Sequence, residues 1–170
     1  KWLNYTNHGY PIENTRIVAL KVPLKEALCD SLEDCDKFSP RMLIRKHPDV
    51  ELIIDLTNTF RYYNPQDFTS RGVKYRKIKT AGHVVPNRRI VEQFCDTIED
   101  FLYDSYDNLT FVGVHCTHGV NRTGFFICSY MIERLGYTPR QAIRLFEESR
   151  GHKIERQNYI EALHRLTPYY

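Results

Sequence analysis

Four short segments along the chain predict the strands of a buried sheet. Residues 50–56 and 109–114 are nearly continuous apolar runs with many β-branched residues, and residues 17–20 form a shorter run. Strands that are buried on both faces, as in parallel sheets covered by helices, have this composition. Residues 73–78 instead alternate between apolar and polar positions, and this period of two also predicts a strand.

Apolar positions spaced three and four residues apart predict helices between the strands. The longest starts after the capping residue Asn87 and continues to about Tyr106. Residues 125–135 are apolar nearly all round, which places their helix centrally, and Gly136 ends it. Shorter helices are expected in residues 25–32, 41–46 after Ser39-Pro40, from Thr138 with a capping box, and in 155–166. This alternation predicts a three-layer α/β fold with a mostly parallel central sheet, as a single domain over residues 1–170.

The composition adds mild constraints. The 170 residues carry a formal net charge of +3, which suits an anionic substrate without proving nucleic-acid binding. The five cysteines are an odd number without framework spacing, which predicts a reducing, intracellular compartment. The sequence lacks an apolar run of about eighteen residues, so no membrane span is expected. The chain starts with Lys1 rather than methionine, so we expect a trimmed fragment.

The candidate chemistry lies in residues 115–124, which we call the phosphate loop. Its sequence is His-Cys-Thr-His-Gly-Val-Asn-Arg-Thr-Gly, and it joins the 109–114 strand to a helix expected to start near Arg122 or Thr123. Gly119 can adopt a positive φ, which lets the loop bend back and turn its amides inward. Amides at a helix start, together with the helix dipole, form a cradle for an anion.

Cys116 is expected at the floor of this cradle, where it is a candidate nucleophile. A free thiol is only a few per cent ionised at neutral pH, but a helix N-terminus and a nearby arginine lower its pKa. Arg122 follows six positions later, and its planar guanidinium can hold two phosphoryl oxygens. A lone cysteine at a strand end is more often a small core residue. The residues around Cys116 favour attack of sulfur on phosphorus instead.

The phosphate loop resembles the signature of the cysteine-dependent phosphatases, which is Cys-x5-Arg-Thr preceded by His. Its full sequence is similar to the RNA 5′-phosphatase branch, which includes the triphosphatase domain of animal mRNA capping enzymes, a baculovirus RNA phosphatase and a phosphatase associated with ribonucleoprotein complexes. Residues 54–59, 61–63 and 150–159 also resemble this branch. The resemblance covers residues 2–163 and implies the three-layer α/β fold, a location in the nucleus, the cytoplasm or both, and no cofactor or metal.

The resemblance also implies roles within the phosphate loop. His115 would orient the loop and tune the thiolate, although a histidine at a strand end can also simply bond to backbone. Thr123 would help the sulfur to leave in the hydrolytic step, and it can cap the helix as well. The other candidate substrate-binding residues of the loop are Thr117, His118, Gly119, Val120 and Asn121. No Cys/His spacing supports a metal site at His118.

The 80–87 loop departs from the protein phosphatases of this family, which usually carry a general-acid aspartate there. It contains no carboxylate, and His83 is its only titratable residue. A tyrosine leaving group, with a pKa of about 10, needs a proton, whereas a phosphate group, with a second pKa of about 6, departs without one. The loop therefore favours phosphoanhydride substrates. Asp55 is the one carboxylate whose family position lies near the pocket, either with an auxiliary catalytic role or fixing the strand end.

Arg156 is a candidate contact for a second phosphate, because the resemblance places it beside the loop; as a helix-start residue it could instead be a solvated charge. Asn158, Lys153 and Arg150 are weaker partners. We therefore predict an enzyme that removes the γ and β phosphates of 5′-triphosphorylated RNA through a cysteinyl-phosphate without a metal, with ribonucleoprotein or small-RNA-processing proteins as partners. Two alternatives are a dual-specificity protein phosphatase, which the missing aspartate disfavours, and a phosphate-binding module, which the intact cysteine and arginine disfavour.

Overall fold

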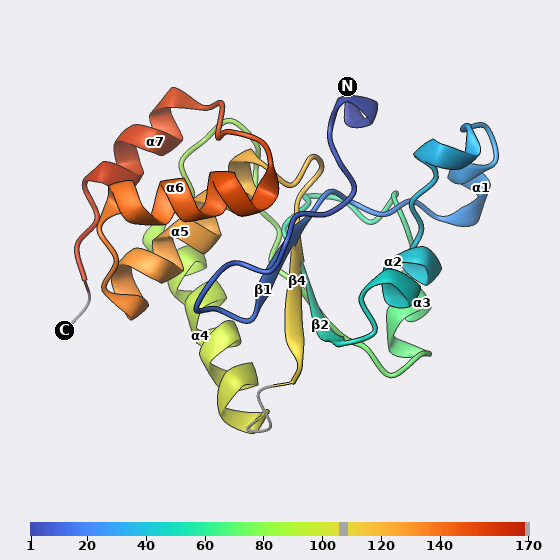
Figure 1. Cartoon of the computed structure of the whole chain (residues 1–170), viewed down its shortest axis with the longest axis horizontal. Coiled ribbons are helices and arrows are strands. Elements are labelled where there is room, and N and C mark those ends of the chain that lie inside the picture. The colour runs from blue at the N-terminus through green and yellow to red at the C-terminus, as the bar shows by residue number, and fades with distance from the viewer. Residues whose placement is uncertain (106–108, 169–170) are drawn as a thin grey trace.

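The computed structural model describes residues 1–105 and 109–168, which contain a four-stranded, all-parallel sheet (Figure 1). The strands are β1 (Ile17–Leu20), β2 (Val50–Asp55), β3 (Lys74–Lys77) and β4 (Phe111–His115), in the order β1-β4-β2-β3. Each strand occupies a segment that the apolar pattern predicts. β4 continues one residue beyond the predicted run, because His115 still pairs with the neighbouring strands on both sides.

Helices and two short 3₁₀ turns pack around this sheet. The helices are α1 (Glu26–Cys29), α2 (Pro40–Lys46), α3 (Gln66–Thr69), α4 (Arg88–Asp104), α5 (Asn121–Leu135), α6 (Pro139–Arg150) and α7 (Gln157–His164), and the turns are Trp2–Asn4 and Asp34–Asp36. α4 to α7 cover one face of the sheet, and α1 to α3 lie on the other side (Figure 1). The predicted three-layer α/β fold is therefore confirmed. None of these helices has the length and apolar character needed to cross a membrane.

Side chains of the strands alternate between two hydrophobic cores. Ile17 and Ala19 of β1 belong to the core under α4 to α7, whereas Val18 and Leu20 belong to the core on the opposite face. This alternation is the pattern of a strand buried on both sides. α5 is buried along nearly all of its length, because it lies between the sheet and the other helices of its layer. Its central position confirms the prediction from its apolar composition.

Local capping signals fix the helix boundaries. The Asn87 side chain accepts a hydrogen bond from the Ile90 amide over 3.0 Å at the start of α4. The predicted capping box at Thr138 is present, and Gly136 ends α5 in a left-handed conformation with φ +79°. α4 ends at Asp104, and the expected end at Tyr106 lies outside the described residues.

The parallel ladder brings the carboxyl ends of all four strands into one row. Leu20 pairs with His115, His115 pairs with Asp55, and Asp55 pairs with Lys77. Ligands of open α/β sheets bind outside this edge. The row therefore gathers the phosphate loop, the segment after β2 and the 80–87 loop at one end of the sheet.

The N-terminal segment, which the sequence pattern leaves irregular, packs along β1. His8 forms an antiparallel bridge with Leu20, and the Gly9 amide donates to the Ala19 carbonyl over 2.9 Å. The Tyr10 amide donates to the Ser149 carbonyl over 2.8 Å. This segment therefore ties the edge strand to the end of α6.

Candidate active site

The phosphate loop turns sharply at Gly119, between β4 and α5. Gly119 has φ +74°, which glycine adopts without steric cost, so the predicted positive φ is confirmed. A Cβ atom on this residue would lie 2.2 Å from the backbone oxygen of Leu20. No other residue type fits there without displacing β1. α5 begins at Asn121, one residue before the expected start.

Donors behind the loop bond to the carbonyls that point away from the cradle and into the protein. The Arg150 side chain, only 2% exposed, donates to the carbonyls of Gly119 and His118, each over 2.9 Å. It also donates to the Thr6 hydroxyl and carbonyl, both over 2.7 Å. The Val22 amide donates to the third carbonyl, of Thr117, over 3.1 Å. These bonds leave the loop amides free to point inward.

This placement corrects the expectation that Arg150 is a weak phosphate partner. Its guanidinium lies within the protein, where protein oxygens engage it. Burial lowers the pKa of Arg150 to about 10, and the Cys116 thiolate acts in the opposite direction. Arg150 therefore stays cationic at neutral pH and stabilises the shape of the loop from behind.

Cys116 lies buried at the end of β4 with its sulfur facing several donors. The Thr123 hydroxyl donates to the Cys116 Sγ over 3.1 Å. Burial by itself opposes ionisation, but the Arg122 charge, the Thr123 hydroxyl and the amides of Thr123 and Gly119 outweigh it and lower the pKa of the Cys116 thiol. The arrangement therefore favours the thiolate, which is the nucleophilic form.

Arg122 connects the phosphate loop to the 80–87 loop. Its Nη1 donates to the Thr80 carbonyl over 2.9 Å, and its Nη2 donates to the Thr117 hydroxyl over 3.0 Å. Both contacts come from residues at the carboxyl edge of the sheet. The guanidinium is therefore held in one orientation next to Cys116 before any substrate arrives, which is the preorganisation that transition-state stabilisation needs.

His115 is fully buried behind the nucleophile. Its Nδ1 lies 3.0 Å from the Cys116 carbonyl, so Nδ1 carries the proton and donates to that oxygen. Its Nε2 lies 2.7 Å from the Tyr63 hydroxyl. Burial lowers the pKa of His115, although Asp55 acts in the opposite sense. His115 therefore holds the backbone of Cys116 in place. This is a bond to backbone, as expected of a histidine at a strand end, and it also orients the nucleophile.

Asp55 anchors a network at the end of β2. Its Oδ1 accepts from the Thr57 amide over 2.9 Å and from the Thr57 hydroxyl over 2.6 Å. Its Oδ2 accepts from Tyr75 over 2.6 Å and from Lys77 over 3.0 Å. Burial favours the neutral acid, but His115 and then these donors outweigh it and lower the pKa of Asp55. With both oxygens engaged, Asp55 is placed to fix the strand end rather than to donate a proton.

A pocket of about 350 Å³ opens above the sulfur. Its walls are formed by Lys1, Gly82, His83, Cys116, Thr117, His118, Asn121, Arg122, Arg156 and Tyr159. Six of the predicted site residues form part of this wall, namely Cys116, Thr117, His118, Asn121, Arg122 and Arg156. Gly119 and Val120 contribute through the loop backbone, since the Val120 side chain is buried in the protein. Among the described residues that form the wall there is no carboxylate.

Arg156 and Asn158 meet the 80–87 loop across this pocket. Arg156 is the N-cap residue of α7, one position before the first helical residue. Its Nη2 lies 3.2 Å from the His83 Nε2, and Asn158 donates to the His83 carbonyl over 3.1 Å. The Asn121 side chain accepts from the amides of Glu155 and Arg156 over 2.8 and 3.0 Å. Asn121 therefore positions Arg156 as well as lining the pocket.

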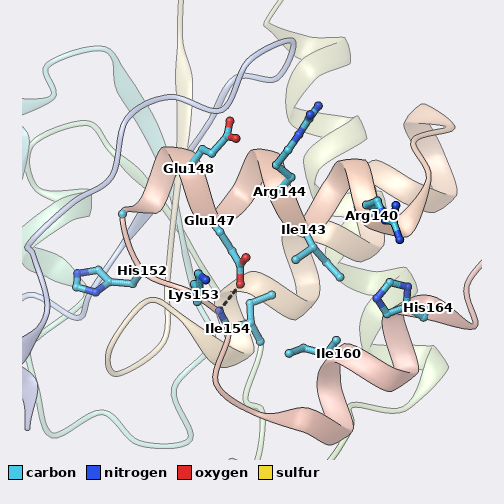
Figure 2. Close-up of a pocket in the computed structure, with 11 residues that line it drawn as sticks. Arg140, Ile143, Arg144, Glu147, Glu148, His152, Lys153, Ile154, Ile160 and His164 are labelled. Carbon is cyan, nitrogen blue, oxygen red and sulfur yellow. Dashed lines mark hydrogen bonds between the residues drawn. The ribbon is translucent and has the colours of Figure 1, made fainter.

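Lys153 does not join this group. It lines a different pocket between α6 and α7, together with Ile143, Ile154 and Ile160 (Figure 2). Figure 2 shows Lys153 beside Glu147, which accepts a hydrogen bond from the Ile154 amide over 2.7 Å. The structure therefore does not bring Lys153 to the Cys116 pocket, because the chain turns away between Gly151 and α7.

His118 lies on the outer rim of the site. Its ring stacks on Tyr5 with centroids 4.8 Å apart. Burial lowers the pKa of His118, with Lys1 as a further contributor. Within the described residues, no group of three or more His, Cys, Asp or Glu side chains is arranged to hold a metal ion. His118 therefore lines the pocket while its ring packs on Tyr5.

Comparison with known proteins identifies the family of this chain. The profile described as "Dual specificity phosphatase, catalytic domain" matches residues 36–167. The chain belongs to the dual-specificity phosphatase family. This result agrees with the fold, with the buried thiol beside Arg122, and with the resemblance of the phosphate loop to cysteine-dependent phosphatases.

Individual relatives of this dual-specificity phosphatase domain match nearly the whole chain. The "Tyrosine-protein phosphatase" of Autographa californica nuclear polyhedrosis virus is 40% identical over 164 residues, which cover 96% of this chain and 96% of that protein. The human "RNA/RNP complex-1-interacting phosphatase" is 44% identical over 167 residues, covering 96% of this chain and 50% of that protein. The chain therefore spans about half of the human relative. The structure of PTPMT1 in complex with PI(5)P, 19% identical, has the same fold, with a TM-score of 0.70 over 94% of this chain and 93% of that chain.

The first testable prediction concerns Arg150. Arg150→Lys keeps a positive charge but reaches fewer of the four oxygens, so we expect a loss of about 1–3 kcal/mol of folding stability for each carbonyl left without a donor. The loop amides should then point less directly at the Cys116 sulfur, so the pKa of Cys116 should rise. Its alkylation by iodoacetamide should then require a higher pH. Peptide mass spectrometry measures alkylation at Cys116, and urea unfolding measures stability.

The matched control is Arg140→Lys on the exposed face of the same helix, which should leave both quantities unchanged. An alkylation profile for Arg150→Lys that coincides with the parent profile would show that the loop keeps its shape without Arg150.

Proposed function

We propose that this phosphatase domain removes the γ and β phosphates of 5′-triphosphorylated RNA and leaves a 5′-monophosphate. The observation that carries the proposal is the second arginine, Arg156, in the wall of the pocket that holds Cys116 and Arg122. A polyphosphate end spreads its charge over successive phosphoryl groups, so it needs a cation beyond the reacting one. A second phosphoryl group would give Arg156 an anionic partner in this pocket, which a substrate with a single phosphoryl group does not provide.

The first chemical step is attack of the Cys116 thiolate on the γ phosphorus. The S–P bond forms as the bond between the γ phosphorus and the bridging oxygen breaks, and the β phosphate of the RNA leaves with that oxygen. Arg122 and the inward amides stabilise the charge on the transferring group. Because these groups supply the positive field, the proposal includes no metal.

The second chemical step is hydrolysis of the cysteinyl-phosphate. Water attacks phosphorus, the S–P bond breaks with its electron pair going to sulfur, and inorganic phosphate leaves as dihydrogen phosphate with both protons of the water. The Thr123 hydroxyl, 3.1 Å from the sulfur, stabilises the thiolate as it forms. A second round on the diphosphate end then gives the monophosphate.

The composition of the pocket wall supports a leaving group that needs no acid. Its titratable groups are cations, histidines, the Cys116 thiol and the Tyr159 phenol, without a carboxylate among the described residues. Asp55 is bonded to Thr57, Tyr75 and Lys77 and is not part of that wall. A phosphate leaving group, with a second pKa of about 6, departs unaided. A tyrosine phenoxide, with a pKa of about 10, does not.

The name of the human relative supports RNA-related partners, and we extend it to this chain as a proposal. We propose ribonucleoprotein or small-RNA-processing proteins as partners in the nucleus or the cytoplasm. A dual-specificity protein phosphatase is the second candidate function, because the baculovirus relative is named a tyrosine-protein phosphatase. The two functions differ in the leaving group, which gives a direct test.

The second prediction is an order of substrates. We expect kcat/KM for 5′-triphosphate RNA to exceed that for a phosphotyrosine peptide by about 100-fold or more, since a general acid contributes at least that much to a basic leaving group. Phosphoserine peptides should be slowest. Release of inorganic phosphate without added divalent metal measures all three rates, with Cys116→Ser as the inactive control. A phosphopeptide rate equal to the RNA rate would favour the protein-phosphatase function.

The third prediction concerns Arg156→Ala. Loss of a charge-assisted contact to the outer phosphate should slow each step by roughly 10- to 100-fold, and diphosphate RNA should accumulate. A chromatographic time course of the 5′ ends measures both steps.

Arg144→Ala, which removes an exposed arginine of α6, is the matched control and should behave like the parent. If Arg156→Ala also behaves like the parent, Arg156 is only a solvated charge. If the parent itself stops at the diphosphate, the two-step proposal is wrong.

A further inference from the structure

The Tyr159 side chain is a polar group of the Cys116 pocket that the chemistry described above does not use. Tyr159 comes from α7, has no exposed surface, and packs against Phe125 with ring centroids 5.4 Å apart. It nevertheless forms part of the wall of the Cys116 pocket. Its hydroxyl is buried and makes no hydrogen bond of normal geometry among the described residues, although the backbone of His83 is close enough to act on its pKa.

A buried hydroxyl without a partner is uncommon and costs free energy, so it calls for a physical explanation. The packing of the ring does not require the oxygen, because phenylalanine would fill the same space. Burial raises the pKa of Tyr159, while Arg122 and Arg156 act in the opposite direction. The group therefore keeps its proton at neutral pH and is a neutral donor in the wall that also contains Arg122 and Arg156.

The neighbours of Tyr159 define which part of a ligand it can meet. In the proposed chemistry Arg122 and Cys116 hold the reacting phosphoryl group, and Arg156 is a second cation in the same wall. The contact of Arg156 with the His83 ring is exchangeable, because a guanidinium only donates and a phosphoryl oxygen can replace the ring nitrogen as acceptor. A second phosphoryl group can therefore take the place of the His83 ring as the partner of Arg156, in the pocket whose wall includes Tyr159.

We propose that Tyr159 is a substrate-binding residue for polyphosphates, whose hydroxyl donates a hydrogen bond to the phosphoryl group adjacent to the one on Cys116. This inference rests on the proposed function and assigns to Tyr159 part of its preference for phosphoanhydrides. On this proposal, a ligand with one phosphoryl group occupies the cradle without using this donor. Tyr159 therefore distinguishes a polyphosphate end from a monophosphate ester.

The fourth prediction tests this donor with small probes, so that it does not depend on RNA. Tyr159→Phe removes only the hydroxyl, and hydrolysis of p-nitrophenyl phosphate reports the occupancy of the cradle. We expect the inhibition constant of imidodiphosphate, a P–N–P analogue with two phosphoryl groups, to rise about 10- to 100-fold in Tyr159→Phe. The inhibition constant of inorganic phosphate should change less than about twofold, which is within ordinary variation for an uninvolved group.

The matched control is Tyr130→Phe, since Tyr130 is a buried tyrosine of α5 outside the pocket wall. It should leave both inhibition constants unchanged. If Tyr159→Phe leaves imidodiphosphate inhibition unchanged, or weakens both inhibitors equally, the inference is wrong. Hydrolysis of 5′-triphosphate RNA by the parent is measured separately, so failure of the RNA proposal is distinguishable from failure of this one.

Discussion

The contact between the Arg150 guanidinium and the phosphate loop is the interaction on which the rest of the site depends. A loop whose amides converge on one anion must turn its carbonyls into the protein, where each needs a donor. Arg150 provides donors to the carbonyls of His118 and Gly119. Because it is also the last residue of α6 and holds Thr6, the shape of the loop is coupled to the packing of α6 and of the N-terminal segment.

The electrostatics of the site follow from a competition between burial and nearby donors. Burial alone can raise a thiol pKa by several units. At Cys116 the Arg122 charge, the Thr123 hydroxyl and the loop amides outweigh burial, and the pKa is lowered. The same arrangement that stabilises a sulfur anion also suits a phosphoryl dianion, so the positive field is present before the substrate binds. Arg156 extends this field outward along the pocket.

The sequence predicted the elements whose signals are local. The strands follow from apolar runs, the start of α4 follows from the Asn87 cap, and the end of α5 follows from Gly136. The positive φ of Gly119 and the cradle position of Cys116 also follow from residues within one loop. α3 was not predicted, because its four residues are too few to show a helical period.

The sequence could not place residues whose roles depend on distant partners. Arg150 resembles a surface cation in the sequence, since its partners at Thr6, His118 and Gly119 are remote or on a loop of unknown shape. Tyr63 and Tyr159 lie in the family-like segments 61–63 and 150–159, but the sequence gives neither of them a role in the site. Lys153 was misplaced for the same reason, because only the turn at Gly151 decides which pocket it faces. The sequence shows the two tyrosines and the basic character of segment 150–153. It does not show which part of the protein each side chain faces.

The central claim is that Cys116 accepts the terminal phosphoryl group of an RNA 5′ end. The measurement that tests it most directly is rapid quenching of the parent protein in detergent at alkaline pH during turnover of RNA labelled with ³²P in the γ position. We predict that the label appears transiently on the peptide that contains Cys116, as a cysteinyl-phosphate, before inorganic phosphate is released. Phosphate release with no protein-bound label at any time point would contradict the account.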